Sequence, residues 1–203
     1  MPLPHQLWNP VAAFSSSDTN GVLVTLPAVT ANGAPSATGS LIFGIGTQSN
    51  NAIGAAQVYE IDAYGNFPKV VYNGVTYTSP NNGSFMDTGS TGIFFSDAHS
   101  LASTGIVECT GDLLGYYCPA SVIPFSVTLY GANNVQGAAP FNIANASSLF
   151  STGFAAFNDL GGDSGTGSST DYLDLGLPFF LGRTVFVGIA GTNSTYPNGY
   201  WAF

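Results

Sequence analysis

One carboxylate, Asp87, stands in a short polar turn between two apolar runs. The turn is Asp87-Thr88-Gly89-Ser90, preceded by Phe85-Met86 and followed by Ile93-Phe94-Phe95. Apolar residues on both sides predict that the segment enters and leaves a hydrophobic core as two strands. An ionised carboxylate in such surroundings is costly to bury unless hydrogen-bond donors stabilise its charge. Asp87 is therefore the first candidate for a chemical role.

The three residues after Asp87 are suited to stabilising that charge. The hydroxyls of Thr88 and Ser90 are donors, and Gly89 allows the backbone to bend and bring N–H groups onto the carboxylate. The alternative is an ordinary hairpin turn, because Asp, Thr and Gly are common turn residues. The apolar flanks favour the first interpretation, and we expect Asp87 to be buried and hydrogen-bonded.

The composition favours a β-fold. The chain has 203 residues, of which 45% are hydrophobic, with 26 glycines, 12 prolines and 13% aromatic residues. A chain of this length can bury a sizeable core as one domain. The abundance of turn formers and aromatic residues is typical of short strands joined by turns. We expect an all-β domain.

The charge argues against two classes of partner. The basic residues are Lys69 and Arg183, against 11 acidic residues, and the formal net charge is −9. Such a chain would repel a nucleic-acid backbone and an anionic membrane surface. No run approaches the roughly 18 apolar residues of a membrane span. We expect no nucleic-acid and no membrane partner.

The two cysteines, Cys109 and Cys118, suit a disulfide. Eight residues separate them, a spacing too wide for a redox or zinc pair and suited to closing one loop. A disulfide implies an oxidising compartment, and hence an extracellular or periplasmic location. The first residues nevertheless lack the basic start and apolar core of a signal peptide.

Alternating apolar segments predict several strands before the Asp87 turn. They cover residues 21–27, 39–46 and 57–63. Residues 69–77 follow as a hairpin, because Asn73-Gly74 is a preferred two-residue turn. After the turn, the Gly/Ser/Thr tract at 161–170 predicts a flexible loop.

This order of segments resembles the C-terminal lobe of pepsin-like aspartic peptidases. In that family a Gly-Ser strand, here 39–46, then a further strand and an Asn-Gly hairpin lead to the second Asp-Thr-Gly-Ser turn, here 87–90. A second match is the segment 172–189. In it, Leu175-Gly176 corresponds to the pair that is threaded beside the catalytic turn. A short helix over 178–182 and a strand over 184–189 would follow.

The resemblance covers nearly the whole chain and implies its organisation. Residues 9–203 would form a pepsin-like (acid protease) single lobe with a threaded ψ-loop and two or three short helices, after a disordered or linker segment at 1–8. Strands would cover 123–131 and 198–203. Cys109 and Cys118 fall where such lobes often carry a disulfide. The chain is most similar to a group of uncharacterised exported bacterial proteins with pepsin-like motifs, from which no activity is carried over.

Asp174 departs from the family pattern, which has an apolar residue before the threaded pair. If its side chain faces Asp87, the like charges raise one pKa. If it faces solvent, the substitution matters little.

The resemblance implies peptide-bond hydrolysis with an incomplete catalytic pair. Aspartic peptidases use two carboxylates that share one proton to activate a water. This chain has one Asp-Thr-Gly turn, so it would contribute Asp87, oriented by Thr88 and Ser90 in a turn that Gly89 permits. A missing N-terminal lobe or a homodimer partner would supply the second carboxylate, and the substrate would be a peptide or protein. The alternative is a non-catalytic secreted binding or structural protein that retains the fold.

Metal binding is a weaker possibility. The segment 158–174 contains Asn158, Asp159, Asp163, Asp171 and Asp174, and such oxygen ligands in a glycine-rich loop suit calcium, although their spacing is not that of an EF-hand. The two histidines are too few for a zinc site. We expect no metal and no cofactor, with calcium in this segment as the open alternative.

Overall fold

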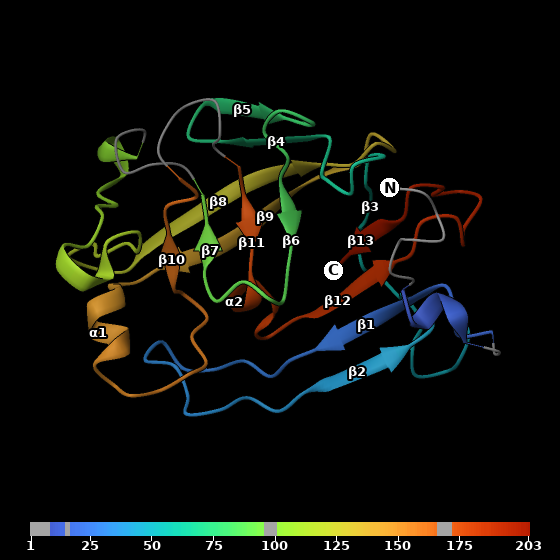
Figure 1. The fold of residues 1–203 in the computed structure, drawn as a ribbon, viewed down its shortest axis with the longest axis horizontal. Coiled ribbons are helices and arrows are strands. Elements are labelled where there is room, and N and C mark those ends of the chain that lie inside the picture. Colours follow the sequence, from blue (N-terminus) through green and yellow to red (C-terminus); the bar gives the residue numbers. More distant parts are fainter. Residues whose placement is uncertain (1–8, 15–16, 96–100, 166–171) are drawn as a thin grey trace.

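The structure is a computed structural model that describes residues 9–14, 17–95, 101–165 and 172–203. The predicted linker at 1–8, His99 and Asp171 lie outside the described residues. The described part folds into three β-sheets with a few short helices (Figure 1). This mainly β architecture confirms the expected fold class at that level.

The largest sheet joins the two ends of the chain. Its order is β2-β1-β12-β13-β3, and each neighbouring pair is antiparallel. The strands are β1 (Gly21–Thr25), β2 (Ser40–Phe43), β3 (Val58–Glu60), β12 (Thr184–Gly188) and β13 (Tyr200–Ala202). Strands β1 and β2 lie within the predicted strand segments 21–27 and 39–46, and β12 and β13 lie within the expected segments 184–189 and 198–203.

A second sheet covers one end of the molecule. Its order is β5-β4-β8-β9, and its strands are β4 (Lys69–Tyr72), β5 (Val75–Thr78), β8 (Ile123–Tyr130) and β9 (Gln136–Ile143). Asn73 and Gly74 have φ of 49° and 75°, as the predicted two-residue turn requires. The sequence analysis missed β9, because its run Gly137-Ala138-Ala139-Pro140 has small side chains and gives little apolar alternation.

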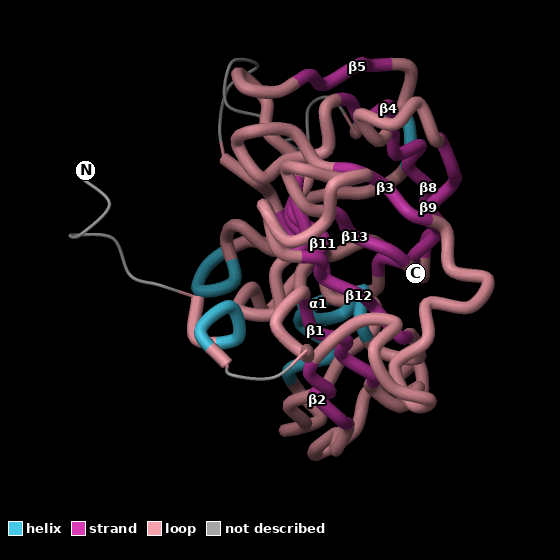
Figure 2. Tube along the Cα trace, turned by 90° about the vertical axis from the view of Figure 1, so that its right-hand side faces the viewer, coloured by secondary structure: helices cyan, strands magenta, loops and turns pink. Residues whose placement is uncertain are grey.

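The third sheet is small and lies at the centre of the fold. Its order is β10-β7-β11-β6, and its strands are β6 (Phe85–Met86), β7 (Ile93–Phe94), β10 (Gly161–Gly162) and β11 (Asp174–Leu175). Figure 1 shows the four strands side by side, with the β6–β7 turn extending below them. In the side view of Figure 2, β11 lies between β4 and β5 at one end and β1 and β2 at the other.

Strand β10 corrects one prediction. Gly161 and Gly162 were expected to begin a flexible loop, but both are buried and pair with β7 in parallel. A Cβ on Gly161 would lie 2.5 Å from Ile143 Cδ1, and one on Gly162 would lie 2.4 Å from the Gly115 carbonyl oxygen. The glycines are therefore explained by close packing in this strand and not by flexibility.

Helices are few and short. They are α1 (Ala146–Phe150), α2 (Leu177–Phe180) and the 3-10 turns η2 (Val11–Ala13), η3 (Ala102–Thr104) and η4 (Gly111–Leu113). Helix α2 overlaps the expected 178–182 but begins one residue earlier, and Asn145 caps α1 by accepting a hydrogen bond from Ser148 N–H at 3.1 Å. Within the described ranges, no helix has the length and apolar character needed to cross a membrane.

A continuous aromatic core holds the three sheets together. Phe67, Phe95 and Phe179 have no exposed surface and belong to one cluster that includes Ile93 and Leu175 of the central sheet. A smaller cluster lies beside α1 and includes Cys109. Cys109 and Cys118 form the predicted disulfide, with an S–S distance of 2.04 Å.

Candidate functional site

Strand β11 is threaded between the two strands that carry the Asp87 turn. It runs parallel to β6 and antiparallel to β7. Asp87 N–H donates to the Leu175 carbonyl oxygen at 3.2 Å, and Leu177 N–H donates to the Ser90 carbonyl oxygen at 2.8 Å. The structure thus brings the predicted pair Leu175-Gly176 against the turn that contains Asp87.

Gly176 is the residue that allows this close approach. A Cβ at this position would lie 2.1 Å from the Gly92 carbonyl oxygen and 2.8 Å from the Ser90 carbonyl oxygen. Both neighbours are backbone atoms and cannot move aside independently of the turn. Only glycine fits where β11 leaves the sheet and α2 begins.

The Asp87 carboxylate is held by the turn as expected. Gly89 N–H donates to Asp87 Oδ1 at 2.7 Å, and the Ser90 hydroxyl donates to Oδ2 at 3.2 Å. Between the described residues Thr88 and Asp87 there is no side-chain hydrogen bond, so the orienting role expected of Thr88 has no contact of this kind to support it. Gly89 does not adopt a left-handed φ. A Cβ there would lie 3.1 Å from Asp87 Oδ1, so this glycine gives the carboxylate room.

The expectation that Asp87 is buried is wrong, because the residue is exposed. Met86 and Ile93 send their side chains into the core, with exposed fractions of 8% and 0%. Successive side chains of a strand alternate between its faces, so Asp87, next to Met86, points away from the core. The apolar residues on either side of the turn indicate which face of the sheet is buried. They do not indicate whether Asp87 itself is buried.

The buried acid of this site is Asp174. It lies in β11 opposite Phe85 of β6 and Phe94 of β7, and paired residues on neighbouring strands share a face. Asp174 is therefore on the same side of the sheet as Asp87, which follows Phe85 by two residues. Only 4% of its surface is exposed.

Burial changes the chemistry of Asp174. Desolvation raises its pKa from the ordinary 3.8 to about 6; a hydrogen bond with Ser90 lowers the pKa in part, and the negative charge of Asp87 raises it. Its Oδ1 atom has no hydrogen-bond partner among the residues that the structure describes. Of the two alternatives stated for this residue, the structure supports the one in which Asp174 lies near Asp87.

Aromatic rings lie on the same face of the central sheet as the two carboxyl groups, because Phe85 and Phe94 pair with Asp174. The Phe85 ring stacks on Tyr172 with centroids 5.7 Å apart, and the Phe94 ring lies 6.2 Å from that of Tyr116. These four side chains are all half-buried. Sequence analysis did not single out Tyr172 and Tyr116 for the site, because neither belongs to a motif and their approach depends on how β11 and the disulfide loop pack.

A second buried acid, Asp159, lies on the other side of β7. It is 2% exposed, and its Oδ1 has no hydrogen-bond partner in the described part of the chain. Desolvation raises its pKa to about 6, while a hydrogen bond from its own backbone N–H lowers the pKa in part. Among the described residues there is no group of three metal-ligating side chains, so the calcium hypothesis for 158–174 gains no support there.

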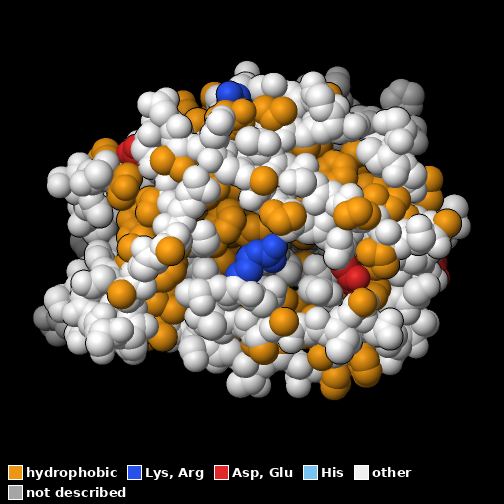
Figure 3. Space-filling model, turned by 180° about the vertical axis from the view of Figure 1, so that it is seen from behind, with side chains coloured by type: hydrophobic (Ala, Val, Ile, Leu, Met, Phe, Trp, Pro, Cys, Tyr) orange, Lys and Arg blue, Asp and Glu red, His pale blue; other side chains and the backbone are white. Residues whose placement is uncertain are grey.

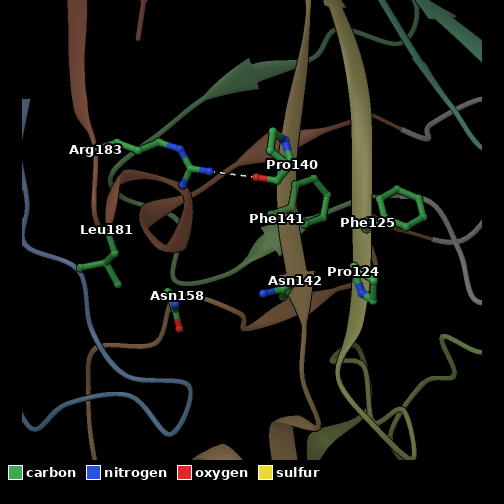
Figure 4. A pocket seen from close by; sticks show the side chains of 8 residues that line it. All are labelled: Pro124, Phe125, Pro140, Phe141, Asn142, Asn158, Leu181 and Arg183. Carbon is green, nitrogen blue, oxygen red and sulfur yellow. Dashed lines mark hydrogen bonds between the residues drawn. The ribbon is translucent and has the colours of Figure 1, made fainter.

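A hollow of about 240 Å³ lies away from the two carboxyl groups, between β8, β9 and the start of β12. Figure 4 shows the Arg183 guanidinium at its edge, donating to the Pro140 carbonyl oxygen at 2.8 Å. Arg183 also donates to the Phe179 carbonyl oxygen at 2.7 Å, so it ties α2 to β9. On the face seen in Figure 3, basic side chains occupy two small areas among hydrophobic and neutral ones.

Comparisons with known proteins give a family but no function. No curated protein matches the chain. A family model described as "Protein of unknown function (DUF3443)" matches residues 1–203. The chain therefore belongs to the DUF3443 family.

Proposed function

We propose that this chain is an aspartic-peptidase-like lobe that contributes Asp87 to the hydrolysis of peptide bonds. The observation that carries the proposal is the threading of β11 between β6 and β7, directly against the turn that holds the Asp87 carboxylate. This arrangement combines a hydrogen-bonded carboxylate with a rigid support from two strands. Its sequence motifs resemble those of the C-terminal lobe of pepsin-like enzymes.

The exposure of Asp87 suits a site that a partner completes. Peptide hydrolysis of this type needs two carboxylates across a shared water, one acting as a base while the other holds a proton. The chain has one Asp-Thr-Gly turn, so a second lobe or a second copy would bring the other carboxylate. An accessible Asp87 can face such a partner, whereas a buried one could not.

Within this lobe each residue has a defined task. Asp87 would be one of the two carboxyl groups at the shared water, where one accepts a proton from the water while the other holds one. The hydrogen bonds from Gly89 N–H and the Ser90 hydroxyl fix the orientation of the carboxylate. Leu175 and Gly176 would hold the turn in place through their contacts with Asp87 and Ser90.

A peptidase assay at acidic pH tests the proposal. The longest natural form of the chain is incubated with a denatured protein substrate, with and without pepstatin, and peptides are identified by mass spectrometry. Asp87→Asn is expected to reduce hydrolysis by at least about 100-fold, as loss of an acid–base group does. The matched control is Asp112→Asn, which changes an exposed carboxylate in η4. Hydrolysis that survives Asp87→Asn would remove the proposal.

The source of the second carboxylate is tested separately. Sedimentation equilibrium over a wide range of protein concentration measures whether the chain dimerises. Activity that rises with the square of protein concentration is expected for a homodimer. A monomer that hydrolyses peptides only together with an upstream lobe would instead identify the two-lobed form.

A non-catalytic binding protein is the second candidate, favoured by the single Asp-Thr-Gly turn. In that case an extended peptide would bind without being cleaved, and Asp87→Asn would leave its affinity unchanged. The Cys109–Cys118 disulfide supports an oxidising compartment for either function, and we propose an extracellular or periplasmic location.

A further inference from the structure

Two carboxyl groups of this one chain meet at a single hydroxyl. The Ser90 hydroxyl donates to Asp87 Oδ2 at 3.2 Å, and the side chain of Asp174 lies within hydrogen-bonding reach of Ser90. Register places both acids on the same face of the central sheet. The Ser90 backbone is fixed in turn by the hydrogen bond from Leu177 N–H.

One hydroxyl cannot satisfy two carboxylates. A serine side chain has one hydrogen to donate and two lone pairs to accept with. If both acids are ionised, one of them goes without the Ser90 hydrogen. If one acid carries a proton, it donates to the Ser90 oxygen while Ser90 donates to the other acid. Ser90 can therefore hydrogen-bond to both acids at once only when at least one of them carries a proton.

The surroundings assign that proton to Asp174 at rest. Asp174 is 4% exposed and, within the described ranges, its Oδ1 has no hydrogen-bond partner. Its charged form is therefore the more poorly solvated, whereas Asp87 is exposed and also accepts a hydrogen bond from Gly89 N–H. Among the described residues, the other titratable groups that interact here are Tyr172 and Asp163: burial, followed by the charges of Asp174 and Asp163, raises the pKa of Tyr172. Neither Tyr172 nor Asp163 carries a positive charge that would neutralise an Asp174 anion.

The basic residues of the chain do not compensate Asp174. Lys69 Nζ lies 3.5 Å from the centre of the Tyr130 ring. Arg183 binds the carbonyl oxygens of Phe179 and Pro140. Among the described residues, a proton is thus the available means of neutralising the buried carboxyl.

We propose that Asp174 is a proton-holding partner of Asp87 and exchanges its proton with it through the Ser90 hydroxyl. In the exchange the Asp174 O–H bond breaks as a new Ser90 O–H bond forms. The original Ser90 O–H bond breaks as an Asp87 O–H bond forms. The negative charge moves from Asp87 to Asp174, and no atom or electron is gained or lost. Asp174 acts through Ser90 and Asp87 and is a positioning residue.

This pairing deepens the proposed function, on which its catalytic consequence rests. Asp87 would be supplied with a proton from within its own lobe. Its protonation state would then be set before any partner carboxylate approaches. The coupling between the two acids is measurable whether or not the protein hydrolyses peptides.

Carboxyl-carbon NMR of the intact chain tests the coupling directly. The Asp174 signal, assigned by its loss in Asp174→Asn, is expected to titrate near pH 6. Asp87→Asn removes the negative charge that raises the pKa of Asp174, so the midpoint should fall by about 0.5 pH unit or more while staying above the ordinary value. Asp112→Asn is the control and should leave the midpoint unchanged.

Hydrolysis supplies the second readout. Asp174→Asn is expected to lower kcat by at least about 10-fold and to remove the ionisation near pH 6 from the kcat profile, with KM nearly unchanged. Asp159→Asn removes an equally buried acid that does not contact Ser90, and should leave the profile intact. A variant that retains the wild-type pH profile without Asp174 would contradict the exchange.

The two proposals fail in different ways. Hydrolysis that survives Asp87→Asn removes the proposed function. An Asp174 midpoint that does not respond to Asp87→Asn, or that lies at the ordinary aspartate value, overturns the proton pairing whatever the hydrolysis assay shows. Circular dichroism of each variant establishes that it is folded before either result is used.

Discussion

Strands β10 and β11 flank the same strand, β7, and each is associated with a buried acid. Asp159 precedes β10 and Asp174 lies in β11, with exposed fractions of 2% and 4%. In both residues desolvation raises the side-chain pKa to about 6. In both, the Oδ1 atom also lacks a hydrogen-bond partner among the described residues. By burial and by pKa alone the two residues are indistinguishable.

Their neighbours separate them. Asp159 lies next to Leu160 and Phe157 in the smaller apolar cluster beside α1, and the hydrogen bond acting on its side chain comes from its own backbone. Asp174 shares the Ser90 hydroxyl with the exposed Asp87. The raised pKa of each acid is thus mainly a consequence of its burial. Asp174, in β11, differs from Asp159 because the carboxyl group of Asp87 lies near it. The neighbours and not the pKa make Asp174 the candidate for chemistry.

The largest loss of stability is expected from substituting the two glycines that pack closely in β10 and at the end of β11. Gly176→Ala places a Cβ 2.1 Å from the Gly92 carbonyl oxygen, and Gly162→Ala places one 2.4 Å from the Gly115 carbonyl oxygen. We expect each to cost about 3 kcal/mol or more of unfolding free energy, since backbone atoms must move. Urea denaturation measures the loss. Gly92→Ala is the control, because its Cβ would meet the movable end of the Phe94 ring at 3.1 Å. Equal midpoints for Gly176→Ala and Gly92→Ala would contradict the threading.

Reduction of the disulfide should destabilise strand β10 more than strand β11. The loop closed by Cys109 and Cys118 binds β10, since Tyr117 N–H donates to the Gly161 carbonyl oxygen at 3.0 Å. Closing a loop of about ten residues contributes roughly 2 to 3 kcal/mol. Hydrogen exchange on the reduced protein should therefore increase at β10 more than at β11. The matched variant is Cys109→Ser with Cys118→Ser. An increase of the same size on both strands would show that the flanks unfold as one unit.

The pH dependence of stability sharpens the comparison of the two acids. Their folded-state pKa of about 6 lies above the ordinary 3.8, so the folded protein binds protons more tightly than the unfolded chain. Stability should therefore be greatest below about pH 4 and fall as the pH rises through 6, by roughly 1 to 3 kcal/mol for each carboxyl. Asp159→Asn and Asp174→Asn should each flatten this decline in urea titrations at pH 4, 5, 6 and 7. A decline that keeps its full slope in both variants would show that other groups cause it.

The smallest loss of stability is expected at Arg183, which links helix α2, the element after β11, to strand β9. Its guanidinium holds the carbonyl oxygens of Phe179 in α2 and Pro140 in β9. Arg183→Lys keeps the charge but has a single nitrogen, and we expect a loss of about 1 kcal/mol in thermal or urea unfolding. Lys69→Arg is the control, because Lys69 packs on the Tyr130 ring across the β4–β8 pair and does not link α2 to β9. An effect at Arg183 no larger than that at Lys69 would assign the residue no structural role.

Local sequence patterns predicted much of the fold. The alternation in 21–27 and 39–46 and the Asn73-Gly74 turn were sufficient for strands β1, β2, β4 and β5, since these depend on short-range geometry. The β10 pair Gly161-Gly162 escaped prediction because two glycines give no apolar signal. Their role depends on Ile143 and Gly115, which are distant in sequence.

The sequence by itself determined that Asp87 is followed by hydrogen-bond donors, that Cys109 and Cys118 can close one loop, and that the chain forms many short strands. These properties depend on residue type and short spacing. Only the tertiary structure decided that Asp87 is exposed and Asp174 buried, and that one serine hydroxyl lies between them. The reason is physical: burial and proximity are set by which strand is threaded between which others, and residues 87 and 174 meet only when β11 enters the gap between β6 and β7.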